Sequence, residues 1–214
     1  MALSIEVFGF GDGEAIPGRF AFCVPGHDAH VDMAPNHNPR VVWAGAPAGT
    51  RSFALLCIDP DAPTDPTDVN KDGVTVPASL PRGEFAHWVV VDIPAHVREI
   101  PEGADSDRVT AKGKPVGRRA HGVVGRNDYT AWFAGDADMA GTYGGYDGPC
   151  PPWNDELVHH YRFTVYALDV DSLGLSGDFG AADATAAMAG HVLAEASHTG
   201  TYTLNRALGA RHDQ

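Results

Sequence analysis

The chain has 214 residues, with 28 acidic residues against 15 lysines and arginines, which gives a net charge of −13. This length fits one domain, over residues 1–214, with a sizeable buried core. The charge argues against nucleic-acid binding, which needs a basic face, and against docking on anionic membranes. The 25 glycines and 16 prolines, without a low-complexity tract, favour a body of strands and turns over a helical bundle.

The number of cysteines and the first ten residues give information on the cellular compartment of the protein. Three cysteines cannot all pair within one chain. Residues 1–10 show no basic leader followed by an apolar stretch, so we expect no secretory signal. No apolar run approaches the length of a membrane span. The simplest expectation is a soluble cytoplasmic protein with reduced thiols and no stable membrane insertion.

The N-terminal part reads as short strands joined by turns. Leu3, Ile5 and Val7 alternate with other residues, as in a half-buried strand, and Phe20 and Phe22 continue the alternation in a second one. A polar loop is expected over residues 26–38, followed by a short strand at residues 41–43. This pattern is typical of a mainly β protein.

An apolar run at residues 55–58 leads directly into Asp59 and Asp61, each followed or preceded by proline. Such a run predicts a buried strand, and proline cannot donate to a sheet ladder. We therefore expect both carboxylates at the lip of a core strand, held stiffly and close together. An ordinary Asp-Pro turn is the alternative.

A long surface loop is expected over residues 64–83, and its length suggests a functional or partly mobile segment. Residues 68–73 match the first half of a calcium-binding loop, but Ser79 stands where the closing Glu belongs, so we interpret them as an Asx-rich turn. The strongest strand signal follows at residues 84–94 and carries His87 near its start.

The C-terminal half alternates between loops and strands. A loop is expected over residues 98–119, a short strand near 127–133, and a rigid glycine- and proline-rich path over 143–153. Tyr161 lies in an alternating strand over 159–169.

A helix is predicted from Asp183, as its N-cap, to about Glu195, with an apolar stripe that includes Met188, Val192 and Leu193. A last strand over 199–204 and a frayed tail over 207–214 complete the chain.

Four motifs stand out: Asp59-Pro60-Asp61-Ala62-Pro63, Phe85-Ala86-His87-Trp88, Tyr146-Asp147-Gly148-Pro149-Cys150-Pro151-Pro152 and His159-His160-Tyr161. Together they resemble the phosphatidylethanolamine-binding protein family, most of all its prokaryotic, Raf kinase inhibitor-like branch. The resemblance runs from about residue 3 to 204 and includes the ending over 190–196. One departure is His160, where the family often has Arg.

The resemblance implies a β-sandwich of two antiparallel sheets with a few peripheral helices, one of them near the C-terminus. It also implies a non-enzymatic binding protein whose small pocket accepts phosphate-like or carboxylate groups, such as a phospholipid headgroup or a phosphorylated ligand. Carried over by motif, the pocket residues are Asp59, Asp61, His87, Gly148, Pro149, His159 and Tyr161. No cofactor is implied. A homodimer and regulation through a protein partner, with residues 64–83 as the contact loop, are further expectations.

The pocket chemistry leaves alternatives open. Ionised Asp repels an anion, so either a charged histidine neutralises an Asp, or an Asp or the ligand carries a proton. Backbone N–H groups around Gly148 are further candidate donors. The second hypothesis is a metal-dependent hydrolase that uses Asp59, Asp61, His87 and His159. The third is nucleophilic catalysis by Cys150 with His159 as base.

Overall fold

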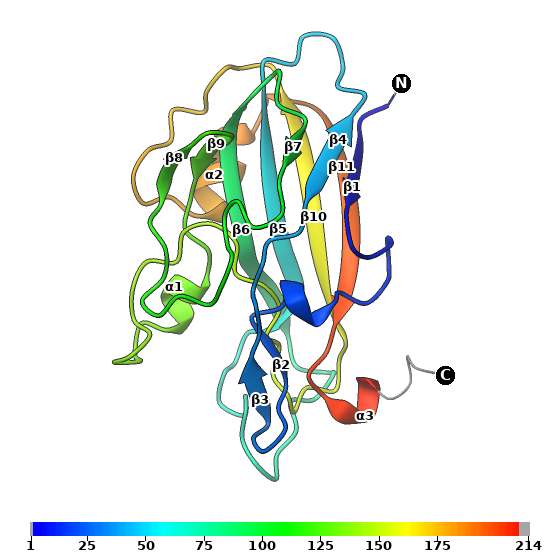
Figure 1. Ribbon diagram of the computed structural model, residues 1–214, viewed down its shortest axis with the longest axis vertical. Coiled ribbons are helices and arrows are strands. Elements are labelled where there is room, and N and C mark those ends of the chain that lie inside the picture. The colour runs from blue at the N-terminus through cyan, green and yellow to red at the C-terminus, as the bar shows by residue number, and fades with distance from the viewer. Residues whose placement is uncertain (1, 210–214) are drawn as a thin grey trace.

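The computed structural model describes residues 2–209, and antiparallel strands make up most of its regular structure (Figure 1). Among these residues the main sheet has the order β11-β10-β5-β6-β9-β8, a second sheet the order β1-β4-β7, and a hairpin joins β2 and β3. The main-sheet strands are β5 (Ser52–Pro63), β6 (Arg82–Pro94), β8 (Gly117–Arg119), β9 (Gly122–Val124), β10 (His159–Leu168) and β11 (Val192–Tyr202). The others are β1 (Ser4–Val7), β2 (Cys23–Pro25), β3 (Val31–Met33), β4 (Val41–Ala44) and β7 (Glu99–Ile100). The prediction of a mainly β sandwich is confirmed.

Strand β5 lies in the middle of the main sheet and is buried on both faces. Phe53, Leu55 and Cys57 point into the larger core, between the main and the three-stranded sheets. Their neighbours Ala54, Leu56 and Ile58 point into a second core on the opposite face. This double burial explains why the run is apolar at every position instead of alternating.

Helices cover only small parts of the body. A 3₁₀ turn η1 (Gly18–Phe20), α1 (Tyr129–Trp132), α2 (Ala181–Met188) and α3 (Arg206–Gly209) are the helical elements of residues 2–209. Helix α2 packs Ala184 and Met188 into the second core. None of the described helices has the length and apolarity that a bilayer crossing requires.

The predicted helix from Asp183 to Glu195 is wrong in its bounds. Gly180 is the N-cap, and Asp183 instead accepts a hydrogen bond from the Gly180 amide at 2.9 Å. The helix ends at Met188, and Gly190 follows with φ of +83°, a conformation that only glycine adopts readily. Val192 and Leu193 therefore begin the long strand β11, which also contains most of the predicted strand over 199–204.

Several shorter predictions also need correction. Phe20 ends a 3₁₀ turn, and Phe22 directly precedes β2 instead of lying in a strand. The second strand of the hairpin, β3, lies within the predicted polar loop over 26–38. The expected strand near 127–133 is helix α1, because Asn127 and Asp128 begin a turn there. The tail forms α3 up to Gly209, and residues 210–214 lie outside the described part.

Candidate functional site

A pocket of about 250 Å³ opens between the ends of β5, β6 and β10 and the β2-β3 hairpin. Four of the predicted residues line it: Asp59, His87, His159 and Tyr161. The remaining lining residues are mainly apolar, and five of them are aromatic: Phe22, Phe85, Tyr129, Trp132 and Phe133. The central geometric expectation, that side chains from distant segments meet in one cavity, therefore holds for these four.

Two irregularities in the strand pairing aim the polar side chains into the pocket. Cys57 pairs with Trp88 and Ile58 pairs with Ala86, which leaves His87 unopposed in a β-bulge. Trp88 already faces the larger core, so strict alternation would send His87 to the opposite face. The bulge turns its ring toward Asp59 instead, as bulges near functional sites commonly do.

The second irregularity lies where β5 was expected to end. After Asp59 pairs with Phe85, pairing resumes only at Ala62 with Gly83. The strand therefore runs through Pro60 to Pro63 and does not stop at the acids. Within this bend the Asp61 amide donates to Asp59 Oδ1 at 2.7 Å, which locks the Asp59 carboxylate.

A chain of ion pairs runs inward from Asp59. Its Oδ2 lies 2.7 Å from His159 Nδ1, and His159 Nε2 lies 3.2 Å from Asp155 Oδ2. Asp155 in turn accepts two hydrogen bonds from Arg82, at 2.6 and 3.0 Å. The side chains of Asp59, His159 and Asp155 are all at most 4% exposed. Two carboxylates thus alternate with two cations, and no net charge is left.

The protonation of His159 follows from these contacts. Burial alone would lower the pKa of His159, but the hydrogen bonds to Asp155 and Asp59 outweigh it and raise the pKa to about 9. Burial would likewise raise the pKa of Asp155, but hydrogen bonds from His159 and Arg82 lower it. At neutral pH His159 is therefore an imidazolium with both protons committed to carboxylates.

His87 has the opposite state. Burial lowers the pKa of His87 below its ordinary value, so the ring is neutral at pH 7. Its Nδ1 lies 2.7 Å from the carbonyl oxygen of Asp147, and since a carbonyl only accepts, the proton is on Nδ1. Its Nε2 is then an acceptor to which no group of residues 2–209 donates, and the ring packs edge-on against Tyr129 and Tyr161.

The hydroxyl of Tyr161 is a buried hydrogen-bond donor that the described residues leave unpaired. Tyr161 is only 1% exposed and lines the pocket, yet its hydroxyl oxygen has no hydrogen-bond partner among the described residues. Burial raises the pKa of Tyr161 well above its ordinary value, so the phenol stays a donor. A buried donor without a partner costs about 1 to 3 kcal/mol, and a ligand oxygen would remove that cost.

The other three predicted residues do not line the pocket. Asp61 turns to the exposed His160, whose amide and Nδ1 lie 2.9 and 2.8 Å from its Oδ2. Gly148 donates its amide to Asn36 Oδ1 at 2.8 Å, so this N–H is not available to an anion. The carbonyl of Pro149 accepts from the amides of Phe22 and Cys23. Gly148 and Pro149 thus support the wall from behind.

Gly148 has a strict steric role that can be tested. A Cβ at this position would overlap the carbonyl oxygen of Phe20, which is backbone and cannot rotate away. We expect Gly148→Ala to lower the free energy of unfolding by about 2 to 3 kcal/mol, as overpacking does elsewhere. Gly135→Ala is the matched control, since no atom lies within 4 Å of its added Cβ. Denaturant unfolding of both variants measures the difference, and equal losses would contradict the steric argument.

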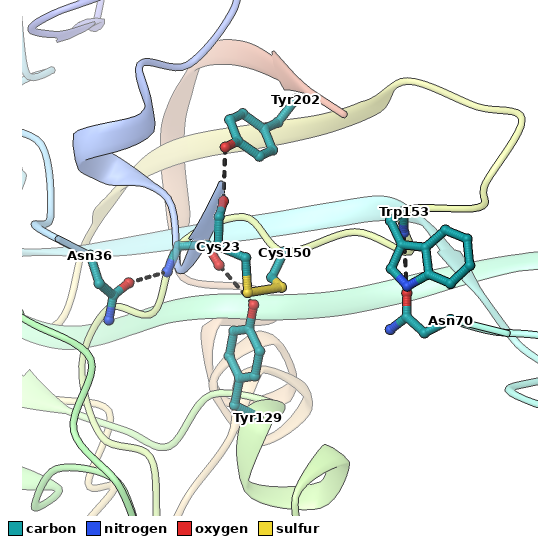
Figure 2. Close-up of a disulfide and its surroundings, with 8 residues drawn as sticks. Cys23, Asn36, Asn70, Tyr129, Cys150, Trp153 and Tyr202 are labelled. Atoms are coloured by element: carbon teal, nitrogen blue, oxygen red, sulfur yellow. Dashed lines mark hydrogen bonds between the residues drawn. A yellow bond between two sulfur atoms is a disulfide. The ribbon is translucent and has the colours of Figure 1, made fainter. Parts of the chain in front are cut away.

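The structure joins Cys23 and Cys150 in a disulfide, as Figure 2 shows. Cys57 is a buried free thiol. The expectation of reduced thiols is therefore wrong for this pair. The two residues are 127 positions apart, and only the docking of the β2 segment against the loop over 148–152 brings them together. A disulfide-bonded Cys150 is no nucleophile, so the structure also removes the third hypothesis.

The geometry does not assemble the metal site of the second hypothesis. Both ring nitrogens of His159 donate to carboxylates, and Asp61 turns away to His160. Within residues 2–209 no group of three or more His, Cys, Asp or Glu side chains is placed to hold a metal ion. The segment over 68–73, which resembles half of a calcium-binding loop, is held by a side chain. Asn154 Nδ2 donates to the carbonyls of Asp68, Lys71 and Val74, at 2.8 to 3.4 Å.

Sequence reasoning missed Asp155, Arg82 and Asp147 as members of the site. Asp155 lies four residues before His159, but this spacing indicates a contact only once the local path of the chain is known. Asp147 positions His87 through its carbonyl, while its buried carboxylate accepts from Asn36, Asn127 and Lys114. No sequence pattern distinguishes Asp155 and Arg82 from ordinary surface charges. Asp147 lies within the motif over 146–152, but the motif does not indicate that Asp147 positions His87.

The fold and the pocket define a β-sandwich protein with one polar cluster enclosed by aromatic walls. A family described as phosphatidylethanolamine-binding protein matches residues 8–203 of this chain. The chain therefore belongs to the phosphatidylethanolamine-binding protein family, as the sequence motifs predict.

Individual relatives agree with this assignment. The UPF0098 protein YbhB of Escherichia coli is 32% identical over 197 residues, which are 90% of this chain and 94% of YbhB. A UPF0098 protein of Aquifex aeolicus is 33% identical, over 92% of this chain and 88% of its own. The crystal structure of Escherichia coli YbcL, described as a new member of the mammalian PEBP family, superposes with a TM-score of 0.67 at 26% identity. It covers 95% of this chain and 99% of YbcL.

Proposed function

We propose that this chain is a non-enzymatic binding protein whose pocket holds a phosphate-like or carboxylate group of a small ligand. The observation that carries the proposal is the buried, unpartnered hydroxyl of Tyr161 beside the free Nε2 of His87. The first is a hydrogen-bond donor, and the second accepts when neutral and donates when charged. The aromatic walls suit the apolar part of such a ligand.

The charges of the pocket restrict the ligand's protonation state. The positive charges of His159 and Arg82 are matched by Asp59 and Asp155, and His87 is neutral at pH 7. These groups therefore present no unpaired positive charge to a bound anion. A singly charged, protonated oxyanion fits better than a dianion, because its hydroxyl donates to His87 Nε2 while another oxygen accepts from Tyr161.

This arrangement predicts a pH dependence of binding. The second pKa of a phosphomonoester is about 6, so the ligand gains its hydroxyl proton as the pH falls below neutrality. Burial lowers the pKa of His87, so this ring stays a neutral acceptor to a lower pH than an ordinary histidine. Isothermal titration calorimetry with glycerol phosphate at pH 5.5 and 8 is expected to show affinity about tenfold higher at the acidic pH. Tighter binding at pH 8, or no binding at either pH, would contradict the proposal.

The hydroxyl of Tyr161 gives the sharpest test. Tyr161→Phe is expected to weaken glycerol phosphate binding about tenfold or more, the usual cost of a lost hydrogen bond to a charged group. Its stability should stay the same or rise, by up to about 1 to 3 kcal/mol, because phenylalanine removes a buried hydroxyl that has no partner among residues 2–209. Tyr166→Phe is the control, since Tyr166 lies on the same strand but packs against the second core. If both variants bind as the unmodified protein does, the hydroxyl does not contact the ligand.

The compartment and the assembly state belong to the proposal as well. We place the protein in the cytoplasm as a monomer or homodimer that reaches other proteins through the loop over residues 64–83. The loop is held to the body by Asn154 and by a hydrogen bond from the Trp153 amide to Asn70 Oδ1, at 3.1 Å (Figure 2). Its outer residues are largely exposed.

A further inference from the structure

The Cys23–Cys150 disulfide is part of the pocket wall. Both cysteines line the cavity, one from the β2-β3 hairpin and one from the proline-rich loop over 148–152. The hairpin side also contributes Met33 to the pocket, and the loop side contributes Pro151 and Pro152. The covalent bond therefore ties together two walls that come from distant parts of the chain (Figure 2).

Non-covalent contacts hold the same two walls. The Pro149 carbonyl accepts from the amides of Phe22 and Cys23, at 2.9 and 3.2 Å. The hydroxyl of Tyr129 donates to the Gly148 carbonyl, and that of Tyr202 donates to the Cys23 carbonyl, both at 2.8 Å. These bonds do not involve sulfur, so breaking the disulfide does not by itself remove them.

The route to the disulfide favours small molecules. Cys23 is 3% exposed, whereas Cys150 is only partly buried. Met33 and Trp132, which also line the pocket, are 61% and 47% exposed and so mark its mouth. A cavity of about 250 Å³ accepts a small thiol but not the active site of a folded protein.

We propose that this disulfide is a reaction site for low-molecular-weight dithiols, which enter the ligand pocket and reduce it in the folded protein. A dithiol thiolate attacks Cys150 Sγ, the S–S bond breaks, and Cys23 leaves as a thiolate that takes up a proton. The second thiol of the reductant then attacks its own sulfur in the mixed disulfide and releases Cys150. The protein gains two electrons and two protons, and the dithiol loses them as it closes to a cyclic disulfide.

Reduction changes the pocket that the ligand would occupy. Two thiols no longer share a bond, so their sulfur atoms separate to van der Waals contact and the pocket surface at Cys23 and Cys150 changes shape. A reductant and a ligand also compete for the same volume. The site thus connects the redox state of the surroundings to the shape of the pocket.

The experiment follows reduction of the folded, full-length protein by dithiothreitol without denaturant. Free thiols are trapped with iodoacetamide and assigned by mass spectrometry, and the buried Cys57 serves as an internal marker of unfolding. We expect labelling of Cys23 and Cys150 but not Cys57, at a rate that rises linearly with dithiothreitol. Saturation at the global unfolding rate, or labelling of all three cysteines together, would overturn the proposal.

A larger side chain placed in the pocket tests whether the reductant reaches the disulfide through it. Ala62 lines the cavity, and Ala62→Phe is expected to slow reduction about tenfold, because exchange rates depend on access to the attacked sulfur. Ala182→Phe, on the exposed face of α2, is the control and should leave the rate unchanged. An unchanged rate in the folded Ala62→Phe protein would refute entry through the pocket.

A second measurement covers the case in which Ala62→Phe does not fold. A protein dithiol of the thioredoxin type, at equal thiol concentration, is expected to reduce the unmodified protein far more slowly than dithiothreitol. If the protein dithiol is as fast, the disulfide is open to large partners and the pocket is not the route.

Discussion

Replacing His159 with alanine is expected to lower the free energy of unfolding by about 3 to 5 kcal/mol, the usual cost of removing one partner from a buried ion pair. The change leaves Asp59 and Asp155 buried without the cation that lies between them. Such a loss is a large fraction of the stability of an ordinary domain. Chemical denaturation at pH 7 measures it.

His160 is the matched control for this prediction. It is the next residue on β10 and also pairs with an aspartate, Asp61, but its side chain is 52% exposed. His160→Ala should therefore cost less than about 1 kcal/mol, as is typical of surface ion pairs. Similar losses for both variants would show that burial does not decide the strength of the His159 network.

The same network predicts how stability depends on pH. The pKa of His159 rises from 6.5 in the unfolded chain to about 9 in the folded protein. Its contribution is therefore complete below about pH 6.5 and is lost as the pH rises through about 9, a change of about 3 kcal/mol. Unfolding curves between about pH 6 and 8.5 test this, and in His159→Ala the decline over this range should be absent. A stability that rises over this range in the unmodified protein would contradict the assignment. At higher pH stability falls in both proteins, because burial also raises the pKa values of Cys57 and Tyr161.

Removing the disulfide is expected to have an effect of similar size. The bond closes a loop of 127 residues, for which the chain-entropy estimate approaches about 5 kcal/mol, while measured losses for native disulfides run from about 2 to 5. The Cys23→Ala/Cys150→Ala protein should lose stability within this range and remain folded through the hydrogen bonds at Pro149.

A reductant supplies the control within the same experiment. Dithiothreitol should lower the free energy of unfolding of the unmodified protein to nearly that of the double variant and leave the double variant unchanged. If the unmodified protein keeps its stability with both thiols shown to be reduced, the disulfide does not contribute to folding as proposed.

Local pattern predicted the long strands well. The apolar run that becomes β5 and the aromatic, β-branched run that becomes β6 are each strongly patterned over several residues, so burial and strand type follow from composition. Prediction failed where the local signal was short or ambiguous. Val192 and Leu193 fit a helical stripe as well as a strand, and Gly190 decides between them by its left-handed backbone conformation.

The chemistry of the site depends on contacts between distant residues. The sequence placed Asp59, His87, His159 and Tyr161 in one pocket through their motifs, and the structure brings them together. The sequence did not indicate that Asp155 and Arg82 complete a cluster without net charge. Nor did it indicate that His87 is neutral while His159 is charged. Charge states are set by burial and by partners many residues away, which local pattern does not contain.

The sequence by itself determined the β-rich class, the family and the residue types that could meet a small anion. Tertiary structure alone decided which of them face the cavity, because a single bulge at His87 and a bend after Asp59 reverse the direction of a side chain. It also decided the pairing of Cys23 with Cys150. The direction of a side chain and the pairing of residues far apart in the sequence depend on the register between strands. Register is a property of the assembled sheet.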